Sequence, residues 1–263
     1  MSWNPDPRFT AAPVQTTPTL LIMTALASEA QSLVSLGRPE VGLVPPPGEL
    51  RRVWRPSTDV WVGYTGLGRA AARAAILPFK GDKAPKRVIF AGVGGALRGD
   101  LDTGDIVIVE TAYTDASDTE RVETTPRFTA AVVAAFERSG LSTRRRGAVL
   151  EVAKIASTPD DKRSLARRWP DALVLGMEDH AVIAAAREVG AEIAAFRVVV
   201  DRLNDSVPDL SPGLDGAGRP LALKLAAHLV RQPAALRALP GLARSFSTAK
   251  AVLDRALHAV LEL

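Results

Sequence analysis

Short apolar runs alternate with segments of helical spacing over most of this chain, from Leu20 to Asp205. The runs, such as Leu20 to Thr24 and Val60 to Tyr64, have the length and composition of strands. Between them, apolar residues recur three and four positions apart, as they do on the buried face of a helix. Strands connected by helices form a sheet that those helices must cover. The alternation therefore predicts a layered α/β domain.

The expected elements follow this pattern in order. We expect strands at 20–24, 60–64, 88–91, 106–110, 147–156, 173–176 and 193–200. We expect helices at 25–37, 65–79, 126–140, 157–169 and from 179 onward. Residues 38–53 are rich in Pro and Gly and are predicted to form a loop or a short edge hairpin, and residues 111–118 a polar loop.

The ends of the chain differ from this central part. Residues 1–19 read as a loose N-terminal tail, and residues 20–205 as the α/β domain. Residues 206–220, rich in Pro and Gly, are predicted to be a loop. Residues 221–263 are predicted to form a C-terminal helical appendage packed on the same domain, as a series of helices broken by Pro233 and Pro240.

Composition excludes several classes of protein. The chain has no cysteine, so disulfides, thiolate metal sites and a cysteine nucleophile are excluded. No signal peptide and no apolar run long enough to cross a membrane is visible, so we expect a cytoplasmic protein. The net charge of +4 is compatible with an anionic partner, but acids interrupt the basic clusters, which favours a solvated surface over nucleic-acid binding.

Two acids stand at equivalent places in the stretch 173–205. Glu178 lies in a tight Gly-Met-Glu-Asp turn after one apolar run, and Asp201 ends the next strand. Open α/β sheets hold ligands at the strand ends, so we expect both carboxylates at a binding site. The turn Gly92-Val93-Gly94-Gly95 follows an earlier strand and could offer backbone N–H groups to a nucleophile or sugar oxygen, or be merely a tight turn.

Three segments in order carry a family resemblance. They are TALASEAQSL, GVGGALRGDLDTGDIVIVETAYTDAS and MEDHAVIAAAREVGAEIAAFRVVVDRLND. They resemble the nucleoside phosphorylase/nucleosidase superfamily, and the likeness spans about residues 20–205. It implies a three-layer sandwich with a mixed central sheet flanked by helices, and cleavage of the N-glycosidic bond of a purine nucleoside, adenine being the favoured base. It also implies a homo-oligomer, with a dimer favoured, and no cofactor beyond phosphate as an optional co-substrate.

The resemblance also implies roles for named residues. Asp201 is the acid that gives a proton to the leaving base, and a carboxyl with that role needs a raised pKa. Glu178 accepts hydrogen bonds from the ribose hydroxyls, with Met177 against the ribose. Glu29 matches the acid that activates water. Further substrate contacts are implied for a last group: Gly92, Val93, Gly94, Ile155 and His180.

Each role has a structural alternative. Asp201 could cap a loop amide, Glu178 could interact only with its helix dipole, and Glu29 could face solvent. Met177 and His180 could be ordinary core and helix residues.

The sequence departs from its relatives on the nucleophile side. Val93 stands where many relatives have a hydroxyl residue, and Phe90 where hexameric phosphorylases have an arginine. A phosphate ion would rely on backbone amides and on Arg69. We therefore expect hydrolysis more than phosphorolysis.

A closer likeness is to the hopanoid-associated phosphorylase branch. It rests on STPDDK at 157–162, on the run Met177 to Ala181, and on the tail RPLALKLAAHLVRQPAALRALPGLAR. That branch implies release of adenine from adenosylhopane by phosphorolysis, and peripheral membrane contact through the C-terminal helices. The alternative for these helices is that they only cover the sheet or build a dimer.

Other interpretations are weaker. Residues 66–71 fit a dinucleotide fingerprint, but no acid ends the strand that would follow it. The three histidines are far apart, which argues against a metal, and no serine sits in a nucleophile elbow. A non-catalytic nucleoside-binding module stays open as an alternative of another class.

Overall fold

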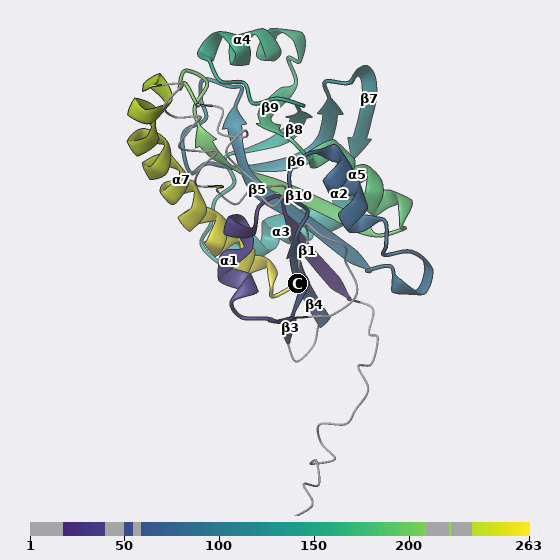
Figure 1. Cartoon of the computed structure of the whole chain (residues 1–263). Coiled ribbons are helices and arrows are strands. Elements are labelled where there is room, and N and C mark those ends of the chain that lie inside the picture. The colour runs from purple at the N-terminus through teal and green to yellow at the C-terminus, as the bar shows by residue number, and fades with distance from the viewer. Residues whose placement is uncertain (1–17, 40–49, 55–58, 209–220, 222–232) are drawn as a thin grey trace, which may run out of the picture.

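A computed structural model describes residues 18–39, 50–54, 59–208, 221 and 233–263 (Figure 1). Its strands are β1 (Leu20–Thr24), β2 (Arg38–Pro39), β3 (Leu50–Trp54), β4 (Asp59–Tyr64), β5 (Arg87–Ala96), β6 (Ile106–Thr114), β7 (Ser117–Glu123), β8 (Arg145–Glu151), β9 (Ala172–Gly176) and β10 (Glu192–Asp201). Its helices are α1 (Ala27–Val34), α2 (Arg69–Ile76), α3 (Pro126–Arg138), α4 (Pro159–Arg168), α5 (Asp179–Glu188) and α7 (Pro233–Val260), with a 3-10 turn η2 at Gly81–Lys83.

Strand β5 is the centre of one mixed sheet. It runs parallel to β1 and to β10, and its last two residues pair antiparallel with β9. From β10 the ladder continues through β6 and β8 to β9, so five strands form a closed ring that begins and ends at β5. Strands β1, β4, β3 and β2 extend the sheet on the other side. The predicted mixed sheet is confirmed, and residues 38–39 and 50–54 form part of the expected edge hairpin.

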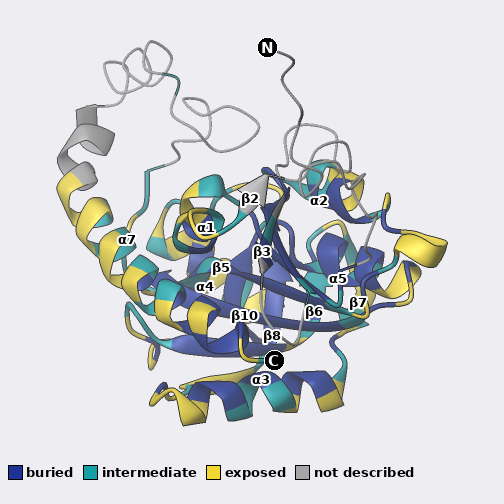
Figure 2. Ribbon diagram, turned by 90° about the horizontal axis from the view of Figure 1, so that it is seen from below, coloured by how far each residue is buried: buried dark blue, intermediate teal, exposed yellow. Residues whose placement is uncertain are grey.

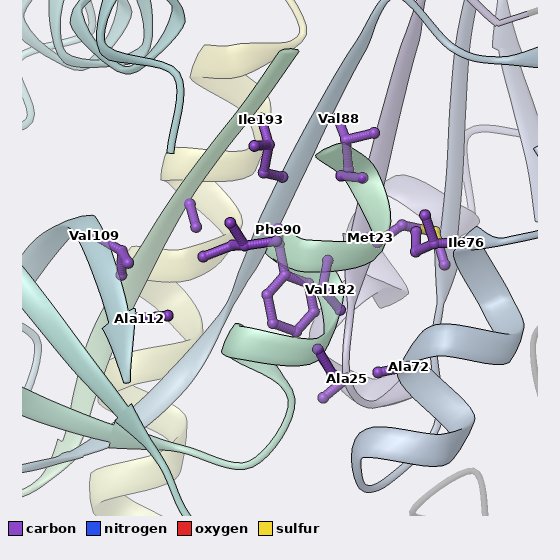
Figure 3. Packing of buried hydrophobic residues seen from close by; sticks show 14 of the residues in the cluster. Met23, Ala25, Ala72, Ile76, Val88, Phe90, Val109, Ala112, Val182 and Ile193 are labelled. Atoms are coloured by element: carbon purple, nitrogen blue, oxygen red, sulfur yellow. The ribbon is translucent and has the colours of Figure 1, made fainter. Parts of the chain in front are cut away.

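Helices cover both faces of this sheet (Figures 1 and 2). On one face α2 and α5 bury small side chains such as Ala72 and Ala185 in a cluster centred on Phe90, which Figure 3 shows among its neighbours. On the other face α1, α3 and α7 bury larger groups, including Phe128 and Leu257. The two apolar layers make a three-layer α/β fold, as the sequence predicted.

Helix α7 differs from its prediction. Residues 233–260 form one helix that contains Pro240, so the expected break at that residue is wrong. A proline inside a helix costs about 3 kcal/mol. The C-terminal half offsets that cost because it buries Leu253, Leu257 and Val260 against the sheet and against α1 and α3. Most of the predicted loop and the start of the appendage lie outside the described residues.

Two local predictions are also wrong. Gly92, Gly94 and Gly95 lie inside β5 and form no turn, because this segment pairs with β10 and β9. Residues 111–118 form no free loop, because β6 continues to Thr114 and joins β7 in a hairpin.

The glycines of β5 are required by what lies against them. A Cβ on Gly94 would stand 2.5 Å from the carbonyl oxygen of Leu175, a backbone atom that cannot rotate away. Arg197 packs where a Gly92 side chain would be, and Asp201 where a Gly95 side chain would be. The backbone of β5 therefore approaches β9 and the charged side chains of β10 directly.

We predict that Gly94→Ala destabilises the protein by about 1–3 kcal/mol, the usual cost of an overpacked core position. The measurement is the free energy of unfolding from urea titrations. Gly99→Ala is the matched control, because nothing lies within 4 Å of its Cβ position. Equal midpoints for the two variants would contradict the close approach.

Candidate active site

A cavity of about 240 Å³ opens where β5, β9 and β10 end. Apolar side chains line most of it, and five charged side chains enter it: Glu29, Lys162, Glu178, Arg197 and Asp201. Several residues predicted from the sequence meet in this cavity: Glu29, Val93, Gly94, Ile155, Met177, Glu178 and Asp201. They come from five separate parts of the chain, so the fold brings the predicted residues together.

Glu29 lies in the first turn of α1 and is 2% exposed, so it does not face solvent. Its Oε2 accepts the N–H groups of Ala25 (3.1 Å) and Leu26 (2.9 Å), and its Oε1 accepts the N–H of Val93 (2.9 Å). Burial raises the pKa of this carboxyl, while Arg197 and the three N–H groups act against that rise. The Val93 amide is therefore bonded to Glu29 and is not free for a ligand.

Glu178 occupies the N-cap position of α5, but its side chain makes no cap hydrogen bond there. Its Oε1 instead accepts the N–H of Gly68 (2.8 Å), across the cavity in the turn before α2. Gly68 has a φ of +85°, a conformation that other residues rarely adopt. Burial raises the pKa of Glu178 to about 7, with Arg197 acting in the opposite direction.

Asp201 is the last residue of β10 and lies opposite Gly95 after a bulge in the strand. Its Oδ2 accepts a hydrogen bond from Lys162, a buried lysine on α4. Burial raises the pKa of Asp201, and the Lys162 ammonium opposes the rise. The sequence predicted the raised pKa but not the cation. The partner of Asp201 Oδ2 is a lysine ammonium, whereas the alternative of a capping carboxylate expected a loop amide.

Arg197 and Asp179 form a second buried ion pair beside the cavity. Arg197 Nε donates to Asp179 Oδ1 at 2.7 Å, and the guanidinium lies 4.5 Å from the centre of the Phe90 ring. Among the described residues, Arg197 Nη2 and Asp179 Oδ2 have no hydrogen-bond partner. The charge of Arg197 lowers the pKa of both Glu29 and Glu178, so one cation acts on two acids of the cavity.

Three predicted residues lie outside the cavity lining. Gly92 stands behind it, against Arg197. His180 is in the first turn of α5 and burial lowers its pKa. Arg69 bonds Glu151 and, at 2.5 Å, Asp115, so both of its recorded contacts are to protein carboxylates.

Lys162 and Arg197 were missed by the sequence analysis, although each left a signal. Arg197 is the one charged residue inside the apolar run 193–200, where a charge must be paired to be buried. Lys162 ends the STPDDK segment, in which Thr158 and Asp161 form the capping box that starts α4.

The charged residues form two groups along β5. Glu29 and Arg197 lie at Gly92, whereas Asp201 lies at Gly95. Three residues of a strand span about 10 Å. The cavity can therefore act chemically on two points of one small molecule, an acid at one end and an acid with a cation at the other. In the described part of the chain no group of three or more acidic or histidine side chains is arranged to hold a metal ion, and no helix is long and apolar enough to cross a membrane.

We predict that the raised pKa of Glu178 makes stability depend on pH. The unfolded carboxyl titrates near 4.5 and the folded one near 7, so the folded state holds the extra proton between these values. The contribution is fully present below pH 4.5 and is lost as pH rises through 7, by up to roughly 3 kcal/mol. Glu178→Gln should therefore gain stability relative to the wild type between pH 5 and pH 8, as measured by urea unfolding at both pH values. The same difference in unfolding free energy between the two proteins at pH 5 and at pH 8 would contradict the raised pKa of Glu178.

No curated protein matches the sequence of this chain, but its fold is similar to those of solved structures. A methylthioadenosine/adenosylhomocysteine nucleosidase from Neisseria meningitidis, in complex with methylthio-immucillin-A, has a similar fold (TM-score 0.72, 13% identity, 93% of this chain and 98% of that one). The same kind of enzyme from Helicobacter pylori (TM-score 0.68, 14% identity, 94% and 99%) and the futalosine hydrolase of that organism (TM-score 0.64, 14% identity, 91% and 97%) are also similar. The phosphorylase superfamily model matches residues 19–232, which is most of the chain, and the chain therefore belongs to the phosphorylase superfamily.

Proposed function

We propose that this protein cleaves the N-glycosidic bond of a purine nucleoside, with water as the attacking group. The observation that carries the proposal is the placement of Asp201 at one end of the cavity, beside Gly95, and of Glu29, Glu178 and Arg197, which interact electrostatically with one another, at the other end. A nucleoside needs help at two such points, the departing base and the sugar. The superfamily, and neighbours whose structures hold nucleoside analogues, support the same substrate class.

Asp201 is proposed as the acid for the leaving base. A purine that departs as an anion is a poor leaving group, and a proton delivered to it removes that charge as the bond breaks. Asp201 is 8% exposed and burial raises its pKa, which is the direction that a proton donor requires. Ile155 and the apolar wall around it are proposed to hold the base.

Glu178 and Met177 are proposed to hold the sugar. When the base leaves, positive charge develops on the ribose, and a carboxylate within the cavity stabilises that charge more than it would in water. Glu178 has one oxygen on Gly68, and no hydrogen bond from the described residues reaches the other. That oxygen can accept the ribose hydroxyls, and Met177 offers an apolar contact beside it.

Glu29 and Arg197 are proposed to position the attacking water. A buried carboxylate is a general base when a water lies within hydrogen-bond reach. Glu29 is already fixed by three backbone N–H groups, so its oxygens are held in place for this task. Gly94 and Val93 are proposed to form the floor against which the sugar lies.

The same charges disfavour phosphate as the attacking group. A phosphate dianion at this end of the cavity would meet Glu29 and Glu178, and the single guanidinium there already pairs with Asp179. Arg69, the cation that the sequence offered for phosphate, bonds Glu151 and Asp115. The balance of charge favours water.

The alternative is phosphorolysis of adenosylhopane. It is favoured by the likeness of the STPDDK segment to the hopanoid-associated branch, because the lysine of that segment lines the cavity. We also propose a homo-oligomer, with a dimer expected, and a peripheral membrane contact of the C-terminal helices. Both rest on the family resemblance. A non-catalytic nucleoside-binding module is the alternative of another class.

A panel of substrates separates these functions. Adenosine, inosine, methylthioadenosine, adenosylhomocysteine and an adenosyl-hopanoid are incubated with the protein, with and without phosphate, and free base, ribose and ribose-1-phosphate are measured. We expect base and free ribose at a rate that phosphate does not change. Phosphate-dependent release with ribose-1-phosphate would support the alternative, and release from none would overturn both enzymatic functions.

We predict that Asp201→Asn lowers kcat by about 10²-fold or more, because an amide cannot deliver the proton. KM should change much less, since the cavity keeps its shape. Asp160→Asn is the control, because Asp160 is exposed on the outer side of α4 and bonds only Arg163 among the described residues. An unaltered kcat in Asp201→Asn would remove this residue from the mechanism.

A further inference from the structure

Lys162 is the least expected residue in the cavity. It is 1% exposed, although lysine is almost never fully buried unless it is paired. Its ammonium has three donors, and the structure gives each of them an acceptor: Oδ2 of Asp201, the carbonyl of Arg202 (2.7 Å) and the carbonyl of Asp205 (3.0 Å). Two of these three contacts hold the turn that follows Asp201. The lysine is thus fixed in one position beside one carboxyl oxygen.

The contact with Lys162 gives the two carboxyl oxygens of Asp201 different surroundings. Oδ2 is bonded to Lys162 and lies 3.0 Å from the Cβ position of Gly95. No hydrogen bond from the described residues reaches Oδ1, and Asp201 lines the cavity. Oδ1 is therefore the oxygen available to a bound molecule.

The charges that face this pair are few. Within the described part of the chain, Asp205, on the same turn, is the one other charge that acts on Asp201, and it raises the pKa of Asp201. Arg202 is directed away, to Asp205 and Asp102. From α4, Asp161 caps its own helix and Arg163 bonds Asn204. Glu29, Glu178 and Arg197 lie at the other end of the cavity. Lys162 is the cation that opposes the effect of burial on Asp201.

We propose that Lys162 is the positioning residue for Asp201: its ammonium fixes Oδ2, leaves Oδ1 facing the substrate, and stabilises the carboxylate that forms when Asp201 gives up its proton. This inference rests on the proposed function. As the bond from the sugar to the base nitrogen breaks, its electron pair passes to the base, and the base takes the proton from Oδ1. Asp201 becomes a carboxylate paired with Lys162, and it takes a proton from solvent once the base has left.

Removing the ammonium tests this role through the pH profile. In Lys162→Gln the carboxyl loses its neighbouring cation, so it holds its proton to higher pH. The basic limb of the kcat profile should move up by about one to three pH units, the usual effect of one close opposite charge. The kcat at the optimum should fall by about 10-fold, less than the loss of the acid itself, because the proton is given up less readily. A limb that stays in place would assign Lys162 a merely structural role, and a limb that moves down would make Lys162 the proton source; either result overturns the proposal.

The absence of cysteine from the chain allows a chemical rescue. Lys162→Cys supplies a single thiol, and 2-bromoethylamine converts it to a side chain with an ammonium at the length of lysine. We expect this product to recover kcat and to return the basic limb toward its wild-type position. Iodoacetamide is the matched control, because it adds bulk at the same sulfur without a charge. Equal recovery with both reagents would overturn the role of the charge.

A measurement without turnover separates this inference from the proposed function. The Asp201 carboxyl carbon is followed by NMR against pH in protein with labelled aspartate. Its titration midpoint should be higher in Lys162→Gln than in the wild type, whether or not any nucleoside is cleaved. If neither variant folds, the wild type decides, because the Lys162 ammonium nitrogen must shift at the pH where Asp201 titrates. Unmoved midpoints, or no coupled shift, would overturn the inference even in an active enzyme, whereas an inactive panel with a moved midpoint would overturn only the function.

Discussion

The close approach of β5 to its neighbours is the constraint on which the site depends. Because Gly92, Gly94 and Gly95 carry no side chains, the backbone of β9 and the charged groups of β10 pack directly against β5. This contact closes the ring of strands, and the ring brings Met177 and Glu178, which follow β9, beside the end of β10. A side chain at Gly94 would separate β9 from β5 and displace Met177 and Glu178 with it. Fold and chemistry are therefore linked through one short segment.

Burial of opposite charges next to one another is the second general feature. An isolated charge in the interior costs several kcal/mol even after the protein relaxes, so each buried charge needs a partner. Asp201 has Lys162, and Asp179 has Arg197. Among the described residues Glu29 accepts three backbone N–H groups and Glu178 one, and burial raises the pKa of both carboxyls. Glu178 therefore keeps an oxygen that a ligand can reach.

The sequence predicted the layered fold and the acids because these depend on local patterns. Periodicity located the strands and helices, Glu178 and Asp201 stand at a turn and at a strand end, and Glu29 was identified through the family resemblance. The errors have a common cause in contacts between distant segments. The glycines of β5 suggested a turn because the groups that require glycine there, the Leu175 carbonyl and Arg197, are more than 75 residues away in sequence. Pro240 suggested a helix end because the packing of Leu253 and Leu257 on the sheet is not visible locally. Lys162 was not predicted as a site residue because its partner, Asp201, lies on another element.

The sum of the charges in the cavity bears on the substrate class of the proposed reaction. With Asp201 protonated, as the proposed mechanism requires, the ionised Glu29 and Glu178 contribute two negative charges, and Lys162 and Arg197 contribute two positive ones. Asp179 behind Arg197 adds a further negative charge, which leaves an excess of one negative charge before the proton is transferred. A site with excess negative charge repels nucleotides, whose phosphates would have to displace these carboxylates from their cations, and it suits a neutral nucleoside. The same excess favours the positive charge that develops on the sugar as the base departs. Binding and reaction are then selected by one property, since the charge that rejects a phosphate is the charge that stabilises the sugar cation.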